Sequence, residues 1–209
     1  MTPRQTFNIL QFLGALSLVL LVAACAGNPA PPPQFYQLRL EPPVAVTAPA
    51  AQSNDIWQVM SPIRVPEYLE HDVLWLPTGN AGLQALPDQR WAEPLSDAVP
   101  RVLLHDLGLL RGTEHIWGGA VPTGVVIASQ LRVELLDLSV TPDRRGVHLR
   151  ARCAATDPRG KVPARVIDID LTAAASGSSP DQLVAAHRLA LWNMAQQLSQ
   201  RLATSNPAP

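Results

Sequence analysis

The sequence predicts an α+β fold in a single domain, mostly an antiparallel sheet with two main helices, the second at the C-terminus. Short runs of alternating apolar residues, separated by Pro, Gly and Asn turns, indicate strands between residues 56 and 174. Two segments, residues 94–110 and 180–202, carry apolar residues at helical spacing instead. No regular alternation of strands and helices supports a Rossmann fold.

The composition excludes several classes of protein. The 209 residues are 47% hydrophobic and carry a formal charge of −1, from 16 basic and 17 acidic residues. This balance provides no basic surface for nucleic acid, so no nucleic-acid partner is expected. A collagen, a coiled coil, a zinc-finger array and a polytopic membrane protein are also excluded, whereas an enzyme is not.

Residues 1–24 predict a secretory signal peptide. Positive charge at Arg4 and the amino terminus precedes residues 9–24, which are apolar apart from two polar side chains. Sixteen helical residues span roughly 24 Å, which is shorter than the roughly 30 Å hydrocarbon core of a bilayer. Together with the small residues at its end, this length is typical of a signal peptide rather than a membrane-spanning helix.

The end of that segment, Val22-Ala23-Ala24-Cys25, resembles the bacterial lipobox. The resemblance implies cleavage before Cys25, a diacylglycerol thioether on its sulfur and an acyl chain on its new amine. Such lipid would anchor the protein, since each buried methylene contributes about 0.8 kcal/mol. An ordinary signal peptide with a chance cysteine is the alternative. No other cofactor is expected.

Two further expectations follow from Cys25. No aspartate follows it, and the enterobacterial sorting scheme then implies the periplasmic face of the outer membrane. Lipidation would also leave Cys153 without a disulfide partner. Because Cys153 lies on the apolar side of an alternating run, we expect a packed, inert thiol.

Proline marks the organisation of the chain after the anchor. Residues 25–34 comprise the lipidated cysteine and a Pro-rich stalk that cannot form a helix or a paired strand. The domain is predicted over residues 35–203, with a strand at 35–40 and a Pro/Ala linker at 41–54. Residues 204–209 are predicted to be a disordered tail.

The first half of the body predicts three short strands and a helix. The strands are expected at residues 56–60, 73–76 and 83–86. A helix follows from Pro94 to about Leu110, and Gly112 lies where a helix stop is expected. Because Pro100 removes a hydrogen bond inside it, we expect a kink or a start near Ser96.

The second half predicts a three-strand meander and the last helix. The apolar phase of residues 125–140 changes midway, which predicts a bulge near Leu135. Strands at 146–156 and 164–174 follow, joined by a turn at 157–160. Ser179 and Gln182 then form a capping box, with Pro180 at the first helical position.

The sequence contains none of the catalytic motifs that were sought. It has no G-x-S-x-G elbow, phosphate loop or dinucleotide fingerprint, so we assign no catalytic residue and expect no enzyme. Asp168 and Asp170 share one strand face and could bind a cation, although a solvated face is favoured. The histidines lack the spacing of metal ligands, so no metal site is expected. These are His71, His105, His115, His148 and His187.

Three segments together resemble one family. Residues 35–38 (FYQL) resemble the aromatic-Tyr-x-Leu that follows its lipidated stalk, and residues 62–70 (PIRVPEYLE) resemble its V-x-V-P-x-Y-L-D segment. Residues 90–95 (RWAEPL) match its most distinctive string. The family is that of the ABC-type transport auxiliary lipoproteins, which are PqiC/YmbA-like, and the match covers most of residues 35–202.

The resemblance implies a non-catalytic accessory of an MCE-type, PqiABC-like ABC intermembrane lipid transport system. Its partner would be the MCE-domain protein, a lipid conduit that it docks at the outer membrane. A homo-oligomeric ring is one form that this docking could take. The rival interpretation is a lipid-anchored periplasmic hydrolase or an activator of a cell-wall enzyme.

The signature residues have two interpretations, direct contact with the partner or stabilisation of the fold, and the second is favoured. Glu93, for example, lies near the positive end of the predicted helix. Two departures from the family pattern, at residues 71–76 and at Pro100, put local docking details in doubt. The signature residues are Arg90, Trp91, Glu93, Pro94, Pro66, Tyr68 and Leu69.

Overall fold

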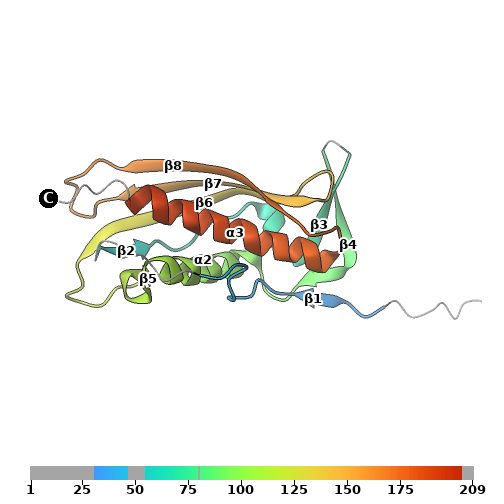
Figure 1. The fold of residues 1–209 in the computed structure, drawn as a ribbon, viewed down its shortest axis with the longest axis horizontal. Coiled ribbons are helices and arrows are strands. Elements are labelled where there is room, and N and C mark those ends of the chain that lie inside the picture. Colours follow the sequence, from blue (N-terminus) through green and yellow to red (C-terminus); the bar gives the residue numbers. More distant parts are fainter. Residues whose placement is uncertain (1–30, 47–54, 80, 204–209) are drawn as a thin grey trace, which may run out of the picture. The chain divides into compact units, whose positions relative to one another are not determined.

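The computed structural model describes residues 31–46, 55–79 and 81–203 (Figure 1). The predictions for the signal peptide, Cys25 and the C-terminal tail lie outside the described residues, as does much of the Pro/Ala linker. The body from residue 33 onward is described by itself below.

Two sheets carry the fold. The main sheet has the strand order β5-β2-β6-β7-β8 and the smaller one has the order β1-β4-β3. The main sheet comprises β2 (Ile56–Val59), β5 (Ile116–Gly118), β6 (Ile127–Val140), β7 (Gly146–Thr156) and β8 (Arg165–Ala174). The smaller sheet comprises β1 (Gln34–Tyr36), β3 (Val73–Thr78) and β4 (Gly82–Trp91).

The longest ladders are antiparallel, and the predicted meander of β6, β7 and β8 is confirmed. Strand β2 pairs in parallel with both β5 and β6, and β1 pairs in parallel with β4. The α+β class is therefore confirmed, with sheets that are mixed.

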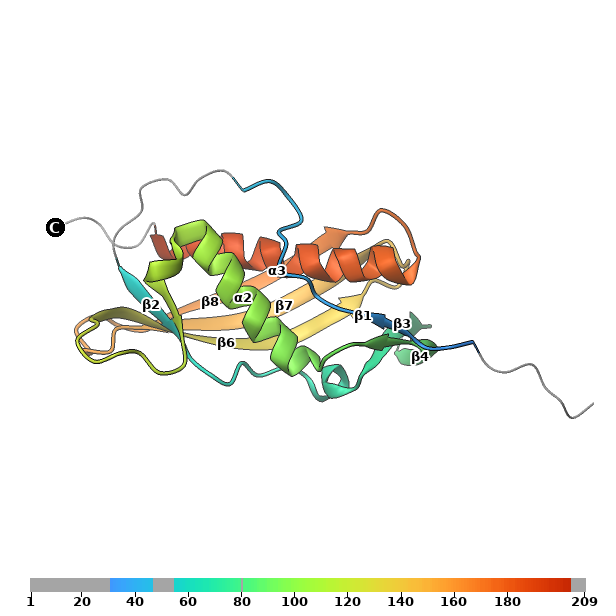
Figure 2. The same cartoon turned by 90° about the horizontal axis from the view of Figure 1, so that it is seen from below.

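Two α-helices, α2 (Leu95–Arg111) and α3 (Pro180–Ala203), cover one face of the main sheet (Figure 2). Two short 3₁₀ turns, η1 (Glu67–Glu70) and η2 (Thr113–His115), lie in the connections. In the described part of the chain, no helix is both long and apolar enough to cross a membrane.

The core lies between the main sheet and the helices. Along β7, Val147, Leu149, Ala151 and Cys153 point inward and are buried, while the residues between them are half-buried or exposed. Burial raises the pKa of the Cys153 thiol to about 12, so the reactive thiolate does not form near neutral pH. The prediction of a packed, inert thiol is confirmed.

Two features that the local sequence predicts are present in the structure, a β-bulge and a helix capping box. The register of β6 against β7 shifts between Leu135 and Asp137, so the predicted bulge is at Leu136, which is 40% exposed. The Ser179 hydroxyl accepts the Gln182 N–H at 3.4 Å, and the Ser179 N–H donates to the Gln182 Oε1 at 3.2 Å. The capping box is therefore confirmed.

Other boundaries differ from the prediction. Helix α2 begins at Leu95, one residue from the expected start near Ser96, and it ends at Arg111, one residue beyond the expected end. It continues through Pro100, because the core-facing stripe of the helix outweighs one lost hydrogen bond. The strand expected at 35–40 ends at Tyr36, and β4 is longer than residues 83–86. Strand β5 was not predicted, because three residues are too few to show an alternation of apolar and polar side chains.

Candidate functional site: the signature segments

Residues 34–40, here called the N-terminal segment, contain the FYQL signature and pair with the body beside the R-W-A-E-P-L string. Tyr36 pairs with Trp91 in the parallel ladder between β1 and β4. The Ala92 N–H donates to the Tyr36 carbonyl at 2.8 Å. Leu38 follows and is buried in the core. The chain therefore enters the fold directly against the R-W-A-E-P-L string.

A buried ion pair holds the end of this segment. The Arg188 guanidinium on α3 donates to both carboxylate oxygens of Asp106 on α2, at 2.7 and 2.6 Å. It also donates to the carbonyls of Arg39 at 2.7 Å and Leu40 at 3.1 Å. Burial raises the pKa of Asp106, and Arg188 opposes that shift. One guanidinium thus connects both helices to the N-terminal segment.

Sequence reasoning missed this pair. Asp106 and Arg188 are 82 residues apart, and no local pattern joins them. The available signal was weak, since each is a charged residue beside the apolar stripe of its helix.

Arg90 and Glu93 of the R-W-A-E-P-L string form ion pairs within the fold. Arg90 Nη1 lies 2.7 Å from Asp72 Oδ2. Glu93 pairs with Arg101, whose guanidinium also donates to the Leu38 carbonyl at 3.1 Å. These contacts again join the signature to the N-terminal segment.

Trp91 and Pro94 shape the corner between β4 and α2. Trp91 is buried and packs edge-on against the His187 ring, with the ring centroids 5.4 Å apart. Burial lowers the pKa of His187 to about 4, so this ring is neutral near pH 7. The Pro94 carbonyl accepts the N–H groups of Asp97 and Ala98 at 3.0 Å each, which starts the helix.

The second signature segment covers the edge of β6 where β2 ends. The Leu135 N–H donates to the Arg64 carbonyl at 2.8 Å. Three residues on, the Leu138 N–H donates to the Tyr68 hydroxyl at 3.1 Å. The Pro66 carbonyl accepts the N–H of the buried Leu69 at 2.9 Å. The segment therefore satisfies backbone donors that an open sheet edge would leave unpaired.

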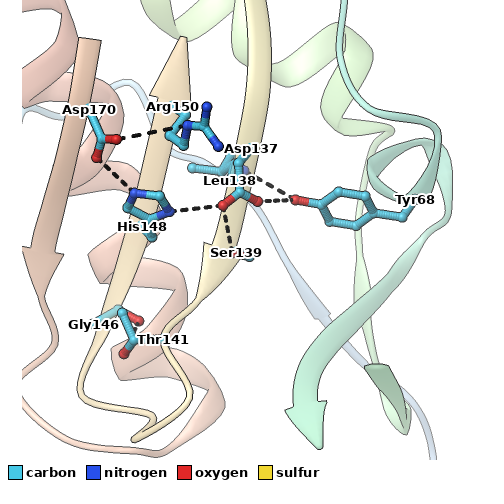
Figure 3. A network of polar contacts seen from close by, with 9 residues as sticks. All are labelled: Tyr68, Asp137, Leu138, Ser139, Thr141, Gly146, His148, Arg150 and Asp170. Atoms are coloured by element: carbon cyan, nitrogen blue, oxygen red, sulfur yellow. Dashed lines mark hydrogen bonds and ion pairs between the residues drawn. The ribbon is translucent and has the colours of Figure 1, made fainter. Parts of the chain in front are cut away.

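Tyr68 also opens a polar network on the sheet (Figure 3). Its hydroxyl donates to Asp137 Oδ1 at 2.7 Å, while Asp137 Oδ2 lies 2.9 Å from His148 Nδ1 and 3.0 Å from the Ser139 hydroxyl. On the other side of the ring, His148 Nε2 lies 2.8 Å from Asp170 Oδ1. The network spans the turn η1 and strands β6, β7 and β8.

This geometry requires a charged imidazole. A neutral histidine has one N–H, whereas both ring nitrogens of His148 face carboxylate oxygens. Burial alone would lower the pKa of His148, but the hydrogen bonds to Asp170 and Asp137 raise it above its usual 6.5. The Ser139 hydroxyl contacts Asp137 rather than His148, so these residues do not form a nucleophile and base pair.

The two carboxylates on β8 have basic partners. Arg152 Nε donates to Asp168 Oδ1 at 2.9 Å, and Asp170 is bound by His148. A solvent-facing strand surface with cross-strand ion pairs is therefore what the structure shows, as favoured above. Within the described ranges, no group of three or more His, Cys, Asp or Glu side chains is arranged to hold a metal ion.

The signature at residues 62–70 and the R-W-A-E-P-L string meet at one small cavity. Tyr68, Leu69, Trp91 and His187 line a cavity of about 20 Å³, which is room for about one water molecule. The contacts of the signature residues described here are with the rest of the fold and with the N-terminal segment.

Comparison with known proteins identifies the class. The family model described as "ABC-type transport auxiliary lipoprotein component" matches residues 36–199, and the chain belongs to this family. The family description makes it an accessory of ABC-type transport and a lipoprotein of the cell envelope, and indicates a non-enzymatic role. No curated protein matches the chain.

Two crystal structures share the fold. One, of an uncharacterized protein, has a TM-score of 0.62 at 16% identity and covers 82% of this chain and 99% of its own. The other, protein XCC0632 from Xanthomonas campestris, described as DUF330, has a TM-score of 0.59 at 13% identity and covers 82% and 95%.

Proposed function

We propose that the protein is a lipid-anchored, non-catalytic accessory on the periplasmic face of the outer membrane. In this role it docks the MCE-domain conduit of a PqiABC-like ABC lipid transport system. The observation that supports this best is the attachment of the N-terminal segment to the R-W-A-E-P-L string and to both helices.

That attachment suits a protein held by lipid at Cys25. Strand β1 begins nine residues after Cys25, so an extended Pro-rich stalk at about 3.1 Å per residue would span roughly 28 Å. Pairing with β4, the burial of Leu38 and the Arg188 hydrogen bonds then fix the chain in the body. A lipidated Cys25 would therefore hold the body within roughly 28 Å of the membrane.

The acyl lipid at Cys25, the outer-membrane location and a homo-oligomeric ring are parts of the same proposal. Palmitate or a related acyl chain on the amine of Cys25 would complete the anchor. A ring would surround the end of a conduit more evenly than one copy could.

Gentle detergent purification of the full-length protein from outer membranes tests the proposal. Proteins that co-purify are identified by mass spectrometry, with an unrelated outer-membrane lipoprotein as control. We expect an MCE-domain protein in the sample and not in the control. Recovery of a cell-wall synthase, or of no partner after crosslinking, would contradict the docking role.

A further inference from the structure

A groove of about 630 Å³ lies at the end of the body away from the N-terminal segment. Its walls come from the first residues of β2 and β6, the loop between β7 and β8, and the end of α3. In Figures 1 and 2 these elements gather at the end opposite β1. We call this the distal groove. Its lining includes Asp55, Val126, Asp157, Arg159, Lys161, Val162 and Arg165.

The distal groove exposes apolar side chains. Val126 is 59% exposed and Val162 is 60% exposed, and both line the groove. Val166 on β8, four residues after Val162, is 62% exposed. Exposed apolar side chains that gather in one region mark interaction sites more often than singly scattered ones do.

Three cations and the two carboxylates of Asp55 and Asp157 line the groove, which gives it a net formal charge of +1. Arg159, Lys161 and Arg165 line it, and Lys161 is the one lysine of the sequence. The Asp157 carboxylate accepts the N–H groups of Arg159 and Lys161 at 2.9 Å each, so its own turn occupies it. Among the described residues, the ion pairs within 4.0 Å include neither Arg159 nor Lys161, although Arg159 helps to lower the pKa of Asp157.

The position of the groove bears on which partner could reach it. Helix α3 has 24 residues, and Arg188, the ninth of them, holds the N-terminal segment. Fourteen residues, about 21 Å of helix, separate Arg188 from Leu202. Leu202 near its end lines the groove. An anchor at Cys25 would therefore keep the N-terminal segment near the membrane and leave the distal groove facing the periplasm.

We propose that the distal groove receives the transport partner, and that its occupant is an acidic segment of that protein carrying an apolar side chain. The cations attract the acidic groups, and the exposed valines receive the apolar group. The inference rests on the proposed docking function and adds the surface that performs it. Cations at the rim would steer the partner and make binding sensitive to salt.

Site-specific photo-crosslinking in the full-length, membrane-bound protein tests the surface. A photoreactive residue replaces Val162, and a matched one replaces Leu83, which is 48% exposed at the hairpin end of β4 and does not line the distal groove. We expect the MCE-domain protein to crosslink at position 162 and not at position 83.

Charge reversal tests the chemistry. Lys161→Glu should lower the amount of co-purified MCE-domain protein about tenfold, while Arg132→Glu, on the exposed face of β6, leaves it unchanged. Wild-type recovery should fall as salt rises, and the Lys161→Glu recovery should depend less on salt. An unchanged circular dichroism spectrum and melting temperature establish that both variants fold.

The outcomes separate the inference from the function beneath it. Crosslinking to the partner at position 83 alone overturns the distal groove and leaves the docking function intact. Crosslinking at position 162 to lipid or to a second copy of this chain also overturns the inference. Failure to recover any MCE-domain protein, even from wild type, contradicts the docking function itself.

Discussion

His148 shows how one residue can make the stability of the sheet depend on pH. Its imidazolium bridges Asp137 on β6 and Asp170 on β8 across β7. Because its pKa in the folded protein lies above the usual 6.5, the stabilisation is fully present below pH 6.5 and is lost as pH rises through the folded pKa. Asp170 is 71% exposed, so we expect an effect below about 1 kcal/mol.

NMR titration of the histidines checks this prediction. His148 should titrate above 6.5, and both Asp170→Asn and Asp137→Asn should lower its pKa. His148→Gln should remove this component of the pH dependence of the unfolding free energy. A His148 that titrates at or below 6.5 in the wild-type protein would show that the two-sided bridge does not persist in solution.

The ion pair of Arg188 and Asp106 yields a second prediction at this scale. Arg188→Met leaves the buried Asp106 carboxylate without its partner, and we expect a loss of about 3–5 kcal/mol in the free energy of unfolding. The double variant Arg188→Met, Asp106→Leu should recover most of that loss, because it leaves no buried charge unpaired. Urea unfolding measures both.

The double variant also separates overall stability from attachment. It still lacks the donors to the Arg39 and Leu40 carbonyls, so amides of residues 34–40 should exchange hydrogen faster than in wild type. Equal exchange rates there would mean that Arg188 does not hold the N-terminal segment.

At the scale of elements, the turn η1 closes the edge of β6 through the Tyr68 hydroxyl. Tyr68→Phe removes the acceptor of the Leu138 N–H and the donor to Asp137. We expect a loss of about 1–3 kcal/mol in the free energy of unfolding and faster hydrogen exchange at the Leu138 amide.

Tyr36→Phe is the matched control, because its hydroxyl contacts only the side chains of Gln34 and Gln89. Its effect should stay within about 0.5 kcal/mol. If both variants lose the same stability, the hydroxyl of Tyr68 has no special role at the strand edge.

The elements also show what the sequence could and could not predict. The bulge at Leu136, the capping box at Ser179 and the β6–β8 meander are local, so periodicity and spacing revealed them. The parallel pairing of β2 with β6 joins residues about 70 positions apart, and a strand of four residues carries no mark of its neighbours.

The same distinction holds for the candidate site. The string at residues 90–95 could be recognised, but its role depends on Tyr36, Asp72 and Arg101, which meet it only in the folded chain. The distal groove was missed because its walls come from four separate segments, none of which has a motif of its own.

At the scale of the whole molecule, the anchor and the body should be separable. The body buries a continuous core between the main sheet and the helices, and residues 34–40 are bound to it by contacts that do not involve lipid. Cys25→Ala should therefore yield a folded protein that leaves the membrane fraction and appears in the soluble periplasmic fraction. Membrane fractionation with immunodetection measures the distribution, and circular dichroism of the released protein establishes that it folds.

Cys153→Ala is the control for this change. It removes the other cysteine of the chain, whose thiol is buried between β7 and the helices. Loss of one buried sulfur should lower the free energy of unfolding by about 1 kcal/mol, while the protein stays in the membrane fraction. If Cys25→Ala also stayed in the membrane fraction, lipid on Cys25 would not be what holds the body, and the distal groove would lose its proposed orientation toward the periplasm.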